Sequence, residues 1–554
     1  MSIACRLCNG LAPWTRVRSF SSLPIVSEQL INDLSALRPT NVTLRMLMRT
    51  GMGGALPVDQ KPPKLSSSGT RHNIDSSWVD DAGASGAARS HISWDSWNAW
   101  DSWDEEKSRR FRQQQGSRAG GATSAKVPTM AEQNDDRHLD AAISPVATDE
   151  ILLQVAAFLL SELPRRYAHR IRELDALPES LRLQKGVIAC RKQFVQSMAE
   201  VLQFEQTPCH PVMGGQGFAF DSLDDERKFA QMVKRNMDRH APTLVLMAGA
   251  LFDYQQQAKL STEDLADNIG LHDRLDSFQL GRIGTRVLCG QYLELHRGWE
   301  GAGTRAAGRI GAGPYVGLIN GLASPATVAQ YAVQDATTLC EREYGTAPDV
   351  VIEGDTEGKF PYIPSHLYYM LFELIKNGMR ATVHSHRSYC DTDGSCSYMP
   401  YLVALPRMEI SIGHSESNED VVIKIHDKGG GISRSHLKRL FSYLFTTARP
   451  STISTSDELI RYGKSTPMAG LGYGLPISRA YARYFGGELT VISVEGHSTD
   501  AYLHINKLGD AEEPLPYFWE GGQFSSAAAL GEETNIWPVQ SSTSDGALQQ
   551  VDYL

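Results

Sequence analysis

The segment over 365–383 carries side chains that could handle a phosphate and a metal ion. At about 100° per residue, one arc of a helix here collects the polar groups Glu373, Lys376, Asn377 and Arg380. Most of the remaining circumference is leucine, isoleucine and methionine. A phosphate site with a metal uses each polar group, because an amide oxygen can bind Mg²⁺, a carboxylate can accept a hydroxyl proton, and cations can bind phosphate.

The alternative for this helix is an ordinary solvated charged face. Asn377 argues against it, because asparagine is a poor former of helix interiors and prefers caps. Glu373 and Lys376 are therefore the candidate catalytic residues. Asn377 is the candidate Mg²⁺ ligand, and Arg380 is the candidate phosphate ligand. Ser365 is the expected N-cap.

A second segment is an apolar strand over 421–426 that ends in one carboxylate and three glycines. Asp427, held at the strand end, could accept a hydrogen bond from the amino group of adenine. Successive glycines let a backbone approach a ligand closely, so Gly429 and Gly431 are further candidates for nucleotide binding. The alternative is an ordinary strand-ending turn.

A third segment is a glycine-rich loop that opens a predicted helix at 474–485. Such a loop offers N–H groups and a favourable helix dipole to phosphates. Its spacing is Gly-x-Gly-x-Gly and not the dinucleotide-binding Gly-x-Gly-x-x-Gly, and no Walker A motif occurs in the sequence. The candidate residues are Gly470, Leu471, Gly472, Tyr473, Gly474 and Leu475.

Composition narrows the class of protein. The chain has 554 residues, 41% apolar and 21% charged, with a net charge of −10, so no global basic field suggests nucleic acid. No apolar run approaches the ~18 residues of a membrane span. The first acidic residue is Glu28, and arginines and serines precede it. This composition predicts a mitochondrial transit peptide over 1–24, and the alternative is a merely disordered start.

The rest of the chain divides by composition and periodicity. Short helices are predicted over 25–52, a low-complexity and disordered insert over 53–147, a helical-bundle domain over 148–320, a mixed domain over 323–508, and a loop-like tail over 509–554. A tryptophan at every third residue over 93–103 could be a docking motif, but we favour a solvated low-complexity insert.

The helices and strands place the three segments. Within 148–320 the predicted helices have short connections, which favours an antiparallel bundle: 150–163, 165–174, 188–206, 222–257 and 261–298. Within 323–508 helices alternate with strands, which favours an α/β sandwich. The helices are 324–344, 365–383 and 474–485, and the strands are 349–353, 408–413, 421–426, 488–494 and 501–506.

In this order the three segments resemble the N, G1 and G2 boxes of the GHKL ATPase superfamily, which are Glu-x-x-x-Asn, Asp-x-Gly-x-Gly and Gly-x-Gly-x-Gly-Leu. Longer stretches are similar to mitochondrial pyruvate dehydrogenase kinases and branched-chain 2-oxo acid dehydrogenase kinases. They are Glu162–Asp175, Glu373–Thr382, Leu440–Pro450 and Gly470–Leu489. The similarity covers about 25–52 and 149–508.

This resemblance implies an α+β fold with an N-terminal antiparallel four-helix bundle, followed by a Bergerat-type (GHKL) α/β sandwich that binds ATP. The implied activity is phosphorylation of serine on the E1α subunit of a 2-oxo acid dehydrogenase, which inhibits that complex. ATP, Mg²⁺ and K⁺ are the implied cofactors. The implied partners are E1α, the lipoyl domain of the E2 core and a second copy of the chain, and the implied location is the mitochondrial matrix.

The resemblance also implies roles for single residues. Glu373 becomes the base that orients the substrate hydroxyl, and Asn377 holds Mg²⁺. Asp427 binds adenine with Thr499 nearby. Thr446, Thr447 and Gly470–Leu475 form the ATP lid and phosphate cradle.

The sequence departs from the family pattern at three points. Tyr369 stands where pyruvate dehydrogenase kinases carry a histidine, although the branched-chain enzymes also lack it. The tail has Trp537 without the aspartate that accompanies it in the family, which puts a tail exchange between subunits in doubt. The insert 53–147 has no counterpart in the family.

Other functions stay open at this point. A two-component histidine kinase would need a phosphoacceptor histidine box, and we find none. A pseudokinase is disfavoured because all three boxes are intact. A zinc site formed by His384, His386, Cys390 and Cys396 has irregular spacing. Between the two substrates, we lean slightly towards pyruvate dehydrogenase.

Overall fold

The computed structural model describes most of the stretches predicted to fold. The described residues are 26–37, 39–51, 148–205, 220, 222–302, 315–387, 404–415, 418–447, 455–459, 471–514, 517–520 and 523–526. The predicted leader 1–24 and the insert 53–147 lie outside them, as do Gly470, Cys390, Cys396 and Trp537.

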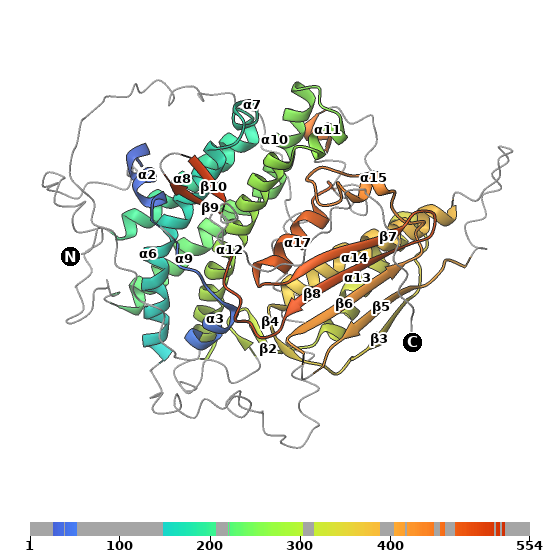
Figure 1. Cartoon of the computed structure of the whole chain (residues 1–554). Coiled ribbons are helices and arrows are strands. Elements are labelled where there is room, and N and C mark those ends of the chain that lie inside the picture. Colours follow the sequence, from blue (N-terminus) through green and yellow to red (C-terminus); the bar gives the residue numbers. More distant parts are fainter. Residues whose placement is uncertain are drawn as a thin grey trace, which may run out of the picture.

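The first half of the described chain is helical, and its long helices lie alongside one another in Figure 1. They are α6 (Thr148–Asp175), α8 (Lys185–Glu205), α9 (Leu223–His240), α10 (Thr243–Gln257) and α12 (Ile269–Ala302). Short helices accompany them: α2 (Glu28–Ser35), α3 (Leu44–Gly51), α7 (Glu179–Arg182) and α11 (Thr262–Ala266). The start of α11 is fixed by a capping box between Ser261 and Asp264. None of the described helices is long and apolar enough to cross a membrane.

Two proline positions correct the predicted helix boundaries. Pro164 lies inside α6 and does not end it. Leu163 and Tyr167 on either side are buried, so tertiary packing holds the helix together across the hydrogen bond that a proline removes. Conversely, the predicted helix 222–257 is two helices, because Pro242 directly precedes α10.

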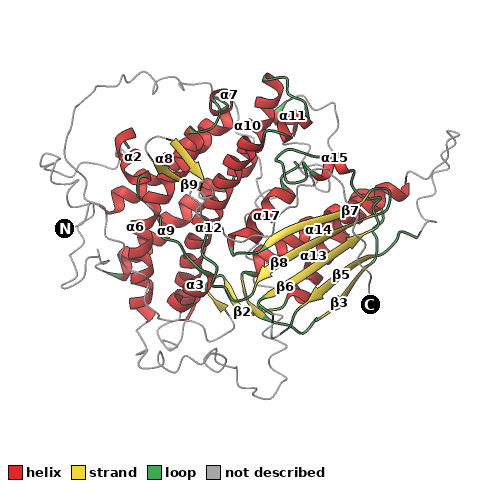
Figure 2. Ribbon diagram, in the orientation of Figure 1, coloured by secondary structure: helices red, strands yellow, loops and turns green. Residues whose placement is uncertain are grey.

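The second half is a five-stranded sheet with helices on one face (Figure 2). The strand order is β3-β5-β6-β8-β7, with β3 parallel to β5 and the other neighbours antiparallel. The strands are β3 (Val350–Gly354), β5 (Met408–Gly413), β6 (Asp420–Asp427), β7 (Glu488–Val494) and β8 (Ser498–Asn506). The packed helices are α13 (Pro325–Tyr344), α14 (Pro364–Arg387) and α17 (Gly474–Tyr484).

The alternation of β6 explains where its last residue points. Val421, Ile423 and Ile425 are buried against the helices, and Asp427 follows on the same side of the strand. Since side chains on one face of a strand recur every second residue, the period of β6 directs the Asp427 carboxylate towards the helical layer.

Short strands form two further sheets that the sequence did not reveal. β1 (Tyr315–Val316), β2 (Ile319–Ala323) and β4 (Phe360–Tyr362) make one sheet. β9 (Tyr517–Glu520) and β10 (Gln523–Ser526) pair as an antiparallel hairpin, which corrects the prediction of a loop-like tail. Strands of two to five residues show too little alternation to be recognised by period.

A buried ionic cluster holds the two halves together. Arg166 Nη1 of α6 lies 2.7 Å from Glu513 Oε1, and Arg166 Nε lies 3.0 Å from Glu162 Oε1. Glu162 also accepts the backbone N–H of Thr40. The segment before α3 and the segment after β8 are therefore both tied to α6. Gly284 of α12 makes room for the cluster, since a Cβ there would lie 2.0 Å from Glu513 Oε1.

Candidate active site

Glu373 and Lys376 form a buried ion pair on α14. Lys376 Nζ lies 2.6 Å from Glu373 Oε1, and the two residues are 1% and 2% exposed. Burial raises the pKa of Glu373, and the Lys376 ammonium opposes that rise. The solvated-face alternative is therefore wrong for these two side chains, which are buried in a helix that packs against α13 and α17.

The apolar side of α14 is as predicted. Leu367, Met370 and Leu371 are buried in the core, and the polar residues Asn377 and Arg380 are half-buried on the opposite arc. The predicted N-cap is wrong by two residues, because α14 already begins at Pro364 and Ser365 is its second residue. A proline is well tolerated at the first helical position.

The start of α17 lies directly against Glu373. A Cβ built on Gly474 would lie 2.1 Å from Glu373 Oε2, so any larger residue would force the Glu373 carboxylate to move. Gly474 is the first residue of α17. The free N–H groups and positive dipole end of this helix therefore lie beside the base candidate, where an anion is also favoured.

Asp427 lies against α14, on the sheet side of that helix. Its Oδ1 accepts the backbone N–H of Gly429 at 2.8 Å, and a Cβ on Gly378 of α14 would lie 3.2 Å from Asp427 Cβ. The side chain is 8% exposed, and burial raises its pKa to about 6. Thr499 is its partner across the β6–β8 ladder. An additional N–H donor would stabilise the ionised form of this buried carboxylate.

The glycines after Asp427 are required by the fold. Gly431 has φ +69°, and a Cβ there would lie 2.0 Å from the Val494 carbonyl oxygen. A Cβ on Gly429 would lie 2.4 Å from the Ala381 Cβ. Close packing against α14 and β7 therefore explains these glycines without a ligand.

The glycine-rich loop packs on the predicted lid. Gly472 has φ +75°, and a Cβ there would lie 2.7 Å from the Leu444 carbonyl carbon. Leu471 and Tyr473 are buried, and Leu475 is half-buried. Thr446 is half-buried and Thr447 exposed. The described part of the loop, 471–475, thus meets the described lid residues.

The structure brings the three predicted segments together around α14. Through Gly378 this helix contacts Asp427, and through Glu373 it contacts Gly474. Sequence reasoning missed Ser493, whose hydroxyl accepts the Ile432 N–H at 2.8 Å and lies 3.0 Å from the Thr499 hydroxyl. It also missed Tyr443, which joins the lid to the helical half. Neither residue lies in a recognisable motif.

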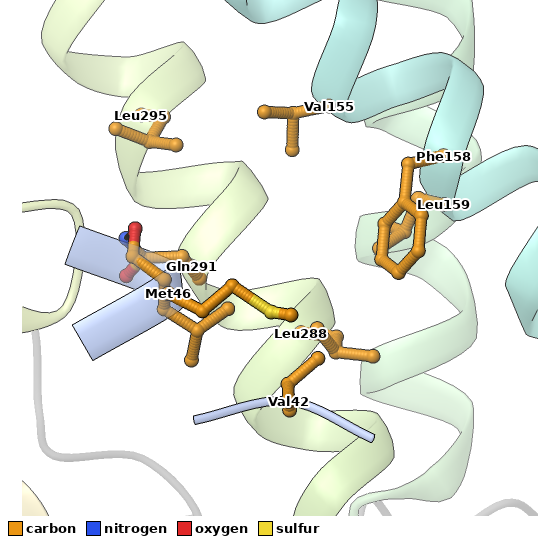
Figure 3. Close-up of a pocket in the computed structure, with 9 residues that line it drawn as sticks. Val42, Met46, Val155, Phe158, Leu159, Leu288, Gln291 and Leu295 are labelled. Atoms are coloured by element: carbon orange, nitrogen blue, oxygen red, sulfur yellow. Dashed lines mark hydrogen bonds between the residues drawn. The ribbon is translucent and has the colours of Figure 1, made fainter. Parts of the chain in front are cut away.

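A small cavity in the helical half is distinct from this site (Figure 3). Its volume is about 20 Å³, roughly the room for one water, which excludes a nucleotide. Its one polar wall residue, Gln291, is engaged: Oε1 accepts the Leu318 N–H and Nε2 donates to the Val316 carbonyl. The labelled lining residues come from the segment around α3, from α6 and from α12: Val42, Met46, Val155, Phe158, Leu159, Leu288, Gln291 and Leu295.

The described residues contain no group of three histidine, cysteine or acidic side chains that could hold a metal ion. His384 and His386 of the zinc alternative lie at the end of α14, but Cys390 and Cys396 fall outside the described ranges. The zinc alternative is therefore untested, and Asn377 is the candidate metal ligand that the structure places beside Glu373, one helical turn away.

Two family models match the chain. Residues 362–508 match the histidine kinase-, DNA gyrase B- and HSP90-like ATPases, which agrees with the convergence of the three boxes. Residues 138–320 match the mitochondrial branched-chain alpha-ketoacid dehydrogenase kinase model. The fold and site thus define an ATP-binding protein kinase of the GHKL superfamily.

Relatives specify the family. A mitochondrial [pyruvate dehydrogenase (acetyl-transferring)] kinase of Arabidopsis thaliana is 40% identical over 369 residues, which are 67% of this chain and 89% of the relative. One from Schizosaccharomyces pombe is 30% identical over 66% of this chain and 92% of its own length. Human isozyme 4 is 31% identical over 65% and 79%. The chain belongs to the mitochondrial pyruvate dehydrogenase kinase family.

Proposed function

We propose that this protein is an ATP-dependent serine kinase that phosphorylates the E1α subunit of the pyruvate dehydrogenase complex in the mitochondrial matrix, and so inhibits it. The observation that carries the proposal is the contact of one helix, α14, with both Asp427 and the start of α17. The names of the relatives support the substrate and the location, because they are mitochondrial kinases of pyruvate dehydrogenase.

The residues present fit a nucleotide with a metal ion. Asp427 would accept the N–H of the adenine amino group, with the Thr499 hydroxyl beside it. Arg380 and the N–H groups of residues 472–474 would hold phosphates, and the Asn377 amide oxygen would hold Mg²⁺. We include K⁺ in this proposal as a further cofactor. When bound, Mg·ATP supplies the phosphoryl group that is transferred.

Glu373 would activate the substrate serine hydroxyl, which accepts the phosphoryl group. We infer that its carboxylate accepts a hydrogen bond from the substrate serine and takes the proton as the phosphoryl group is transferred. Lys376 keeps this buried carboxylate ionised, since an opposite charge at 2.6 Å favours the charged form. Gly474 lets the phosphate loop approach the base.

The proposal extends to architecture and assembly. The long helices α6, α8, α9 with α10, and α12 would form the antiparallel four-helix bundle of this family. A leader at 1–24 would direct import, and 53–147 would be an insert without a fold of its own. A homodimer is supported by the edge strand β7, where Ile492 and Val494 are 56% and 59% exposed. The E2 lipoyl domain is the proposed docking partner on the complex.

One observation favours a second substrate. The family model over 138–320 carries the name of the branched-chain alpha-ketoacid dehydrogenase kinase. The relatives cover more of the chain and carry the pyruvate name, so pyruvate dehydrogenase is our first choice.

One assay separates the candidates. The purified full chain is incubated with labelled ATP and either pyruvate dehydrogenase E1, branched-chain E1, or neither. Phosphoserine on pyruvate dehydrogenase E1α is the expected product. Labelling of branched-chain E1 alone would identify the branched-chain dehydrogenase as the substrate in place of pyruvate dehydrogenase. Phosphohistidine on the chain itself would indicate a histidine kinase, and ATP binding without any transfer would indicate a pseudokinase.

A further inference from the structure

The lid segment, residues 439–447, is docked on the helical half. Its partner is the docking corner, residues 265–276, where α11 leads into α12. Ser442 Oγ donates to the Ala266 carbonyl at 3.0 Å, and the Arg439 guanidinium lies 2.6 Å from each carboxylate oxygen of Asp267. These contacts join chain segments separated by more than 160 residues.

His272 links the docking corner to the lid segment, because one ring nitrogen bonds within the corner and the other accepts from the lid. Its Nε2 lies 2.9 Å from the Leu265 carbonyl oxygen, and its Nδ1 lies 3.3 Å from the Tyr443 backbone nitrogen. A carbonyl can only accept and a backbone N–H can only donate, so the ring is neutral with the proton on Nε2. Burial lowers the pKa of His272, which is consistent with that state.

Tyr443 forms the buried centre of the contact. The residue is 1% exposed, its ring stacks on His272, and its hydroxyl donates to Asp276 Oδ1 at 2.6 Å. The Arg439–Asp267 pair is different, because Asp267 is largely exposed, and exposed ion pairs contribute little. Among these hydrogen bonds between the lid and the corner, the one between Tyr443 and Asp276 is made by two side chains that are both shielded from solvent.

The other side of Tyr443 faces the phosphate loop. The rings of Tyr443 and Tyr473 are 5.1 Å apart. Leu444 is fully buried with φ +63°, an uncommon backbone conformation that surrounding contacts must maintain. Its backbone packs on Gly472, and Gly474, two residues further on, touches Glu373. A continuous line of packed groups thus runs from α12 to the base candidate.

We propose that the docking corner positions the nucleotide lid, with Tyr443 and Asp276 as positioning residues that touch no substrate. Held by α12, the lid segment and residues 471–474 keep the shape that binds phosphates. The inference rests on the proposed nucleotide site. By reciprocity, a nucleotide that needs this shape stabilises the docking contact in turn.

The test is Mg·ADP affinity of the purified full chain, measured by calorimetry, for Tyr443→Phe, Asp276→Ala and Asp276→Asn. We expect Tyr443→Phe and Asp276→Ala each to weaken Mg·ADP binding about tenfold, the scale of one lost hydrogen bond to a charged group. Asp276→Asn keeps an acceptor oxygen for the tyrosine hydroxyl, so it should restore most of the affinity. The double variant Tyr443→Phe/Asp276→Ala should be no weaker than Asp276→Ala alone.

Tyr292→Phe is the matched control. Tyr292 is buried, and its hydroxyl donates to the Glu226 carboxylate at 2.5 Å. It lies on α12, about 24 Å from Asp276 at ~1.5 Å per residue. Thermal unfolding of all variants measures how much stability each substitution removes, so that this loss can be separated from the loss of Mg·ADP affinity. Hydrogen exchange of residues 265–276 should slow on Mg·ADP binding in the wild type and not in Tyr443→Phe.

The outcomes are distinguishable. Wild-type protein that fails to bind Mg·ADP contradicts the proposed function itself. Wild-type binding with Tyr443→Phe within twofold of it overturns the positioning role alone. Equal losses of affinity in Tyr292→Phe and Tyr443→Phe would overturn it as well, because the effect would then be general destabilisation.

Discussion

The pKa of Asp427 predicts how nucleoside affinity changes with pH. Burial raises this pKa to about 6, and the ionised form is the stronger acceptor for the adenine amino group. Binding therefore releases a proton whenever the free carboxyl is protonated. If only the ionised form binds, the apparent dissociation constant is multiplied by 1 + 10^(pKa − pH). The factor is about 1 at pH 8 and about 11 at pH 5, close to 1.4 kcal/mol.

Adenosine is the ligand for this assay, because it lacks the phosphate groups that also titrate near pH 6. Calorimetry at several pH values between 5 and 8 should show constant affinity above about pH 7 and a loss of about tenfold by pH 5. Circular dichroism at each pH checks that the fold persists. Adenosine affinity that stays flat down to pH 5 would refute the assignment of Asp427 as the adenine acceptor.

Three further perturbations address separate parts of the site. Asp427→Asn should abolish measurable ATP binding in calorimetry. The substitution loses a charge-assisted hydrogen bond worth ~1.5–3 kcal/mol, and the new side-chain NH₂ can face the adenine amino group, which is also a donor. Unchanged affinity would contradict the adenine assignment. Gly474→Ala should lower turnover at least tenfold with the fold retained, since its Cβ would meet Glu373 Oε2 at 2.1 Å; near-normal turnover would mean that the loop does not need this close approach. Deleting 53–147 should leave activity on isolated E1 nearly intact, because a solvated insert contributes little to a core. Loss of activity with the fold preserved would show that 53–147 is not merely a solvated insert.

Local periodicity predicted the elements that carry the site. The 3.6-residue period of α14 placed Leu367, Met370 and Leu371 in the core, and the alternation of β6 gave its buried face. These patterns are properties of consecutive residues, so they can be read without knowing the rest of the fold. The order of the three segments indicated the GHKL superfamily, and the longer similar stretches, such as Gly470–Leu489, indicated the kinase family.

Contacts between distant segments could not be predicted in this way. The close approach of α17 to the Glu373 carboxylate joins positions about a hundred residues apart in the chain. The bond between Tyr443 and Asp276 joins positions 167 residues apart and leaves no motif. Pro164 was expected to end a helix, and packing on both sides kept α6 intact. Tertiary burial decided each of these cases.

Phosphoryl transfer depends mainly on the positioning of the reactants. Substitutions of Asn377 and Glu373, which have different proposed roles, should therefore have different effects. Asn377→Ala should weaken Mg·ATP binding and lower turnover, because it removes the proposed metal ligand. Glu373→Gln preserves the size of the side chain and should leave ATP binding intact, because the proposed role of this carboxylate concerns the serine hydroxyl.

The most direct test of the account is the rate of phosphoryl transfer from ATP to E1α by Glu373→Gln, measured under conditions where calorimetry shows that the nucleotide site is saturated. Loss of a general base predicts a rate ~10²–10⁴-fold below wild type with unchanged ATP affinity. A saturated Glu373→Gln enzyme that transfers phosphate at a near-wild-type rate would contradict the central claim that this buried carboxylate is the base.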